Sequence, residues 1–137
     1  SMNEHVHTTS ELTKNQALVM GALSQSDSPL SAYTILDQLR DDGFRAPLQV
    51  YRALDKLVEF GLVHRLESLN AFVACRHPGC DAHQTIAFMI CETCGQVNEI
   101  SDTSLAERLK QLASKAGFAL KKSTVELRGI CGNCQAA

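Results

Sequence analysis

Two pairs of cysteines, Cys91-Glu92-Thr93-Cys94 and Cys131-Gly132-Asn133-Cys134, constrain this chain more than any other feature. Two residues between paired thiols let a tight turn aim both sulfurs at one point, and two such turns complete a tetrahedral thiolate cage that suits zinc. Residues 95–130 separate the pairs, so this stretch must contain secondary structure rather than a simple loop. A cage of four protein ligands leaves no open coordination position, and it therefore predicts a structural site.

The composition limits the class of protein. The 137 residues allow one ordinary domain or two small ones, and the 45% of apolar residues supply a core without any stretch long enough to span a membrane. The polar start carries no secretory signal, and six cysteines without one favour metal binding in a reducing cytoplasm over disulfides. The net charge is −2, so any binding of nucleic acid would depend on a local basic patch. We therefore expect a cytoplasmic protein with no membrane partner.

Residues 1–76 have the pattern of three short helices followed by a hairpin. Thr13 to Gln16 has the form of a capping box for the first helix, and Ser31 caps a second helix that ends before Gly43. Pro47 suits the first turn of a third helix, which stops at Gly61. Two β-type segments, 62–66 and 71–74, come next. This order predicts a winged helix-turn-helix domain, in which the third helix can enter a DNA major groove.

The outward side of the third helix carries side chains suited to reading bases. Gln49 and Arg52 are the types that pair with adenine and guanine edges, and Tyr51 can pack on a thymine methyl or a phosphate. The phosphate contacts that position such a helix would come from basic residues, namely Lys14, Arg45, Lys56 and Arg65. The alternative is an ordinary solvated helix face. The hairpin directly after the helix favours DNA binding.

Residues 77–137 have a different pattern. Pro78-Gly79, within the range 77–82, predicts a hinge. Residues 83–137 predict strands at 86–90, 96–100 and 123–127, and an amphipathic helix that ends at Gly117. The fold class is then α+β, with a small α/β dimerisation domain containing the four-cysteine zinc site. A domain this small has a marginal core and open sheet edges, so we expect it to depend on zinc and to form a homodimer.

A second group of metal-binding side chains surrounds this junction: His64, Cys75, His77, Cys80, His83 and Glu99. Imidazole, thiolate and carboxylate together suit zinc better than iron or manganese. Because the ligands come from both halves of the chain, a metal held by them would fix the angle between the halves. The local set Cys75-x-His77-x₂-Cys80-x₂-His83 is an alternative that spacing alone leaves open.

The runs Val50-Tyr51-Arg52-Ala53-Leu54-Asp55-Lys56-Leu57 and Gly61-Leu62-Val63-His64, with the two CxxC pairs, resemble the ferric uptake regulator family, and within it the zinc-responsive branch. The resemblance extends from Leu12 to Cys134. It implies a dimeric bacterial transcriptional repressor that uses zinc as co-repressor for zinc-import genes. Its partner would be double-stranded DNA with an AT-rich inverted-repeat operator. The resemblance implies neither enzymatic activity nor a small organic substrate.

The resemblance also implies two zinc ions per subunit. By position, the structural zinc falls on Cys91, Cys94, Cys131 and Cys134, and the regulatory zinc on His64, Cys75, His83 and Glu99. Tyr51 and Arg52 match the family's DNA-reading pair, and Tyr33 matches a further contact. Gln49 stands where a threonine is common. The histidine-rich run of many iron and peroxide sensors is reduced here to His83-Gln84-Thr85, which favours zinc.

Other functions compete with this interpretation. An iron- or peroxide-sensing regulator of the same family is the nearest alternative. The CxxCG and GxCxxC sequences also resemble a rubredoxin-type iron centre, which would make the protein an electron carrier but would leave residues 1–74 without a role. A thiol oxidoreductase would need one reactive, metal-free CxxC pair.

Overall fold

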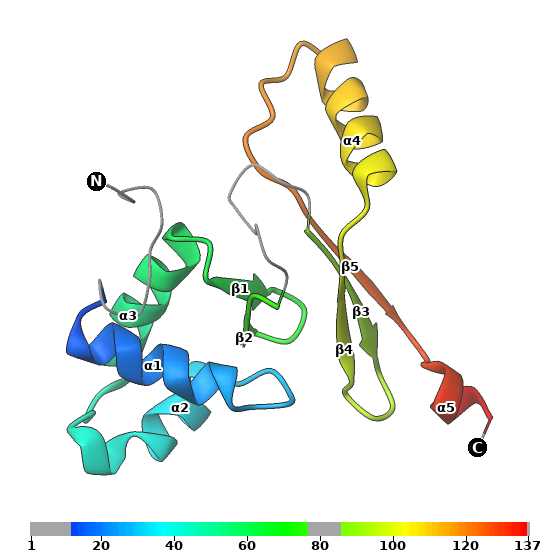
Figure 1. Ribbon diagram of the computed structural model, residues 1–137. Helices are drawn as coiled ribbons and strands as arrows, with labels where there is room; N and C mark the ends of the chain where they lie inside the picture. The colour runs from blue at the N-terminus through cyan, green and yellow to red at the C-terminus, as the bar shows by residue number, and fades with distance from the viewer. Residues whose placement is uncertain (1–11, 77–85, 137) are drawn as a thin grey trace. The chain divides into compact units, whose positions relative to one another are not determined.

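The computed structural model describes residues 12–76 and 86–136 (Figure 1). The described residues form two compact units, with the boundary between Cys75 and Arg76. The predicted hinge, residues 77–82, lies outside the described residues, and so does the predicted ligand His83. In the described ranges, no helix has the length and apolar character needed to cross a membrane.

The first unit contains three α-helices and a hairpin, as predicted, and one short 3₁₀ helix that was not predicted. Its helices are α1 (Lys14–Ser24), α2 (Ala32–Gln38), the short 3₁₀ helix η2 (Arg40–Asp42) and α3 (Pro47–Glu59), and its strands are β1 (Val63–Leu66) and β2 (Ala71–Ala74). Thr13 and Gln16 form the predicted capping box of α1. The Ser31 hydroxyl accepts the Thr34 N–H at 3.1 Å at the start of α2. These contacts satisfy backbone donors that a helix leaves unpaired in its first turn.

A single apolar core holds the first unit together. Helix α3 contributes Val50, Leu54 and Leu57 to it, and α1 and α2 pack against α3. The strands pair antiparallel with His64 opposite Val73. Leu30, just before α2, adds an isolated antiparallel bridge to Phe72 that the sequence did not reveal. The predicted winged helix-turn-helix is therefore confirmed, and its core fixes the direction in which α3 faces solvent.

The second unit is a three-stranded sheet with one long and one short helix. Its elements are β3 (Ile86–Cys91), β4 (Val97–Ile100), α4 (Thr103–Lys115), β5 (Thr124–Gly129) and α5 (Gly132–Gln135). The strand order is β4-β3-β5, with β3 antiparallel to β4 and parallel to β5 (Figure 1). Because β3 and β5 run in parallel, Cys91 at the end of β3 comes level with Gly129, two residues before Cys131. The topology thus brings the two cysteine pairs to the same end of the sheet.

Candidate metal centres and nucleic-acid interface

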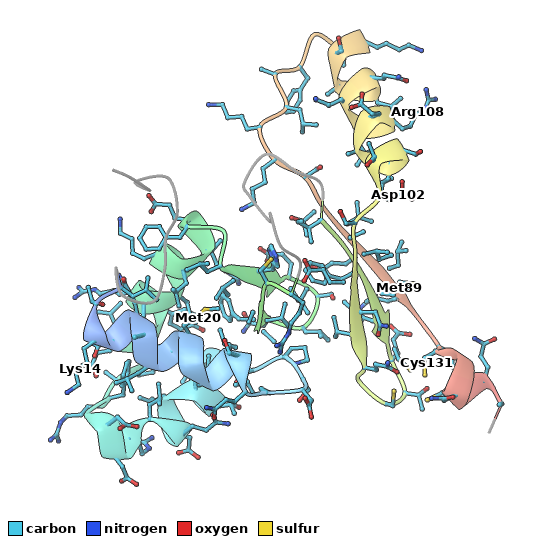
Figure 2. The ribbon with its side chains drawn as sticks, in the orientation of Figure 1. Lys14, Met20, Met89, Asp102, Arg108 and Cys131 are labelled. Atoms are coloured by element: carbon cyan, nitrogen blue, oxygen red, sulfur yellow. The ribbon has the colours of Figure 1, made fainter. Side chains whose placement is uncertain are left out.

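The four knuckle cysteines form one cluster at this end of the second unit. Cys91 ends β3, Cys94 follows in the turn, and Cys131 and Cys134 lie at the start of α5 and within it (Figure 2 labels Cys131). The four sulfurs all lie within 4.8 Å of one another, and all four thiols are free. The Cys94 and Cys131 sulfurs are 3.8 Å apart. Zn–S bonds of about 2.3 Å in a tetrahedron place sulfurs about 3.8 Å apart, so the residues fit a structural zinc ion.

Backbone N–H groups point at one sulfur of the cluster. The Cys91 Sγ accepts the N–H of Cys131 at 3.3 Å and that of Cys94 at 3.4 Å. These donors, that of Cys131 first, lower the pKa of the Cys91 thiol to about 6. The pKa of Cys134 is raised to about 12, chiefly by its hydrogen bond with the Cys131 side chain. The backbone thus favours the thiolate at Cys91, while the close neighbours oppose a second negative charge unless a cation is present.

Two residues of the second predicted metal site lie together on the wing. His64 is on β1 and Cys75 directly follows β2, and their ligand atoms lie within 4.8 Å of each other. The Cys75 N–H donates to the Leu62 carbonyl oxygen at 2.9 Å, which extends the hairpin by one step and holds Cys75 beside His64. The expectation that the cysteines favour metal binding over disulfides does not hold for Cys75, which is in a disulfide bond in this structure. The four knuckle cysteines are free. A metal ion can use the Cys75 sulfur only as a thiolate, so this bond must first be reduced.

Glu99, the carboxylate predicted for the same site, lies on β4 of the second unit and is half-buried. Its Oε1 accepts the backbone N–H of Arg76 at 3.2 Å. Arg76 is the residue that follows Cys75 in the chain. The carboxylate is therefore held toward the first residue of its own unit.

The predicted DNA-reading side chains lie on the helices of the first unit. Tyr33 on α2 and Arg52 on α3 are exposed. Lys14, labelled in Figure 2, is exposed at the start of α1. Tyr51 is half-buried and packs against the core. Arg52 makes no ion pair or hydrogen bond with another of the described residues. Its guanidinium therefore has its donors available for phosphate or a guanine edge.

Gln49 has a structural role that its sequence position had not indicated. Its Oε1 accepts the backbone N–H groups of Arg45 at 2.6 Å and Ala46 at 3.0 Å, and so closes the N-terminus of α3. The bidentate contact with adenine needs both ends of the amide. In this conformation only the NH₂ group of Gln49 is available to a base. A glutamine three residues after the N-cap position was the available signal, but an alanine, Ala46, at that position concealed it.

Arg65 on β1 is exposed but held by its neighbours. Its Nη2 donates to Asn70 Oδ1 at 3.2 Å, its Nε lies 3.6 Å from Glu67 Oε2, and its guanidinium carbon lies 5.8 Å from the centre of the Phe72 ring. Asn70 adopts a left-handed conformation with φ of 50°, which closes the turn of the wing. The wing thus presents one cation in a fixed position.

The fold and the clusters define a winged-helix protein with a four-cysteine metal site. The sequence model of the ferric uptake regulator family matches residues 8–128, and the chain belongs to this family. A curated relative, the zinc uptake regulation protein of Escherichia coli (strain K12), is 40% identical over 124 residues, which cover 90% of this chain and 72% of that protein.

Solved structures agree with this assignment. Holo XcZur is similar with a TM-score of 0.83 and 39% identity, covering 92% of this chain and 87% of that one. A zinc uptake regulator complexed with zinc and DNA is similar with a TM-score of 0.83 and 38% identity, covering 90% and 83% of the two chains. The predicted family and fold class are therefore confirmed.

Proposed function

We propose that this protein is a zinc-responsive transcriptional repressor, which acts in the cytoplasm and has no catalytic activity. The observation that carries the proposal is that one winged-helix unit holds both an available Arg52 on α3 and a His64–Cys75 ligand pair on its wing. Under this proposal, the DNA-reading helix and two of the metal ligands belong to the same small unit. The similarity to a zinc uptake regulator complexed with zinc and DNA supports this combination. Genes for zinc uptake are the targets that such a repressor would control.

We propose that Cys91, Cys94, Cys131 and Cys134 hold a structural zinc ion. When bound, zinc supplies a four-thiolate cross-link at that point. The four residues join the end of β3 to α5, which follows β5, so they fasten the end of the sheet. Since α5 has only four residues, it depends on this attachment for its place.

We propose that a second zinc ion is held by His64, Cys75, His83 and Glu99. His64 and Cys75 belong to the winged-helix unit, whereas Glu99 belongs to the other unit. His83 falls in the predicted dimerisation domain, residues 83–137. Ligands that share one ion restrict how freely their two parts of the chain can move. His77 and Cys80 remain alternative ligands in the predicted local set. Zinc binding at this site adds about one positive charge per subunit, which is small beside the many phosphates of an operator. The ligands therefore act on DNA binding by fixing the geometry of the two parts of the chain, and not through charge.

We propose that the working form is a homodimer assembled through the second unit. Helix α4 has an apolar stripe but contains no buried residue in the described structure, and Leu112 is 47% exposed. Met89 and Leu127, paired across β3 and β5, are also exposed. Strands β4 and β5 form the edges of the sheet. A second copy would cover these apolar side chains, and its two-fold symmetry would match the proposed AT-rich inverted-repeat operator.

The test is to select DNA with the protein itself. The reduced chain is incubated with a random duplex library in the presence of zinc, iron(II) or manganese(II), and the bound duplexes are sequenced. The proposal predicts an inverted repeat that is enriched with zinc and not with the other two metals. Enrichment only with iron(II) would establish the alternative, an iron-sensing regulator. A lack of enrichment with every metal would refute DNA recognition.

A further inference from the structure

An exposed leucine occupies the first turn of α3, beside the residues proposed to read DNA. Leu48 is 57% exposed. It lies between Pro47, the first residue of α3, and the capping residue Gln49. Large apolar residues of the first unit are otherwise mostly buried in its core. A single exposed leucine has no significance by itself. Its position on the helix gives it one.

Leu48 lies on the same helical face as the DNA-reading pair. Residues three and four apart are neighbours on a helix, and Leu48 is three residues before Tyr51 and four before Arg52. The face continues to the exposed Asp55, whereas Val50, Ala53, Leu54 and Leu57 form the buried face. A helix that presents Arg52 to base edges therefore presents Leu48 to the adjacent base pairs.

The first turn of α3 is held rigidly enough for this contact to be specific. Pro47 fixes its own φ at the first helical position. The Gln49 amide oxygen ties the turn to the N–H groups of Arg45 and Ala46. These restraints surround Leu48 on both sides in the sequence. Its side chain thus starts from a defined backbone position.

The chemistry of the major groove leaves one partner for such a side chain. Base edges there present hydrogen-bond donors and acceptors, and the C5-methyl group of thymine is their apolar feature. We propose that Leu48 packs on one thymine methyl in each half-site and so determines specificity for thymine at that position. This assignment rests on the proposed function. It adds a base contact that differs in kind from the polar contacts of Arg52 and Gln49.

The experiment removes the two partners separately. The thymines of the zinc-selected duplex are replaced by uracil one position at a time, in both half-sites. Each replacement deletes only the methyl group. Affinity is measured by fluorescence anisotropy for the reduced zinc-loaded protein and for Leu48→Ala. Leu69→Ala is the matched control, because Leu69 is also an exposed leucine of this unit, at 41%, but lies in the turn of the wing. The chain's two tyrosines, Tyr33 and Tyr51, both lie in this unit, so tyrosine fluorescence shows that each variant is folded.

At one thymine position, uracil should weaken binding by the wild type about fourfold per half-site, which is the effect of losing one buried methyl. The loss of two methyls, one in each half-site, should weaken binding roughly 10- to 20-fold. The same replacement should leave Leu48→Ala unaffected and should weaken Leu69→Ala as it does the wild type. If every uracil effect persists in Leu48→Ala, the Leu48 contact does not exist. If zinc enriches no duplex, the proposed function itself fails, and the Leu48 assignment fails with it.

Discussion

The Cys94 and Cys131 sulfurs lie 3.8 Å apart, although residues 95–130 separate them in the chain. That separation is the one expected for two thiolates on a shared zinc ion. It follows from the parallel pairing of β3 with β5, which returns the chain to the end of the sheet where Cys91 already lies. The metal site and the topology of the sheet thus have a common origin.

Cys94→Ser tests the structural role of this cage. The variant should lose about one zinc per chain, because apparent zinc-binding energies of about 10–16 kcal/mol in such sites are coupled to folding. We expect the second unit and the dimer to be lost together. Zinc content by mass spectrometry and oligomeric state by sedimentation measure this. Cys75→Ser is the control and should retain the cage zinc; a Cys94→Ser protein that stays dimeric would refute the structural assignment.

Arg52→Ala tests the reading of bases by α3. Each lost bidentate contact costs about 1–3 kcal/mol in discrimination, so a duplex with two half-sites should lose roughly 30-fold or more in affinity. Zinc content should not change. Lys56→Ala is a matched control on the same helix, where Lys56 lies 3.4 Å from Glu59. Lys56→Ala should bind all DNA sequences slightly more weakly, and by the same factor for each. If Arg52→Ala also lost affinity by the same factor for every sequence, base reading by Arg52 would be contradicted.

Gln49 separates helix capping from DNA contact. Gln49→Ala removes the acceptor for two N–H groups and should destabilise the first unit by about 1–2 kcal/mol. Gln49→Glu keeps an acceptor and suits the positive end of the helix dipole, so its stability should be retained while its affinity for DNA falls. Urea unfolding followed by tyrosine fluorescence reports this unit alone. Gln38→Ala, exposed at the end of α2, is the control and should change neither property.

The redox state of Cys75 should decide how much zinc the protein holds. The fully reduced protein should bind two zinc ions per chain under the proposed assignment, whereas protein with Cys75 in its disulfide should keep only the cage ion. Zinc per chain is measured after gel filtration with and without prior phosphine reduction. His64→Ala should hold the lower amount in both states. Equal zinc content in the reduced and oxidised wild type would exclude Cys75 as a ligand.

The helix starts could be predicted from local chemistry, because Thr13, Ser31 and Pro47 act on backbone groups within a few residues. The Leu30–Phe72 bridge could not, since a single long-range pair leaves no periodic signal. Helix α5 was missed because Gly132 and Asn133 indicated only a metal-binding turn. The stripe on α4 was predicted from its leucines, and its exposure in one chain shows that periodicity indicates which face is apolar but not what covers it.

The metal sites, like the fold, could be predicted where the signal was local in the sequence and less well where it depended on contacts between distant residues. Spacing alone predicted the four knuckle cysteines, and the structure brings all four together. His64 and Cys75 also meet, because the hairpin register places the end of β2 beside the start of β1. His83 lies outside the described residues, so its part in the second site stays a prediction.

A zinc titration of DNA binding tests the central claim most directly. Reduced protein that retains its cage zinc is titrated with buffered zinc, and its affinity for the selected duplex is followed by anisotropy. A switch from about 1% to about 99% of the DNA-competent form requires about 5.5 kcal/mol of differential binding. We therefore predict that affinity rises about 100-fold, and that His64→Ala shows no such rise. An affinity that is the same at every zinc concentration would contradict the account.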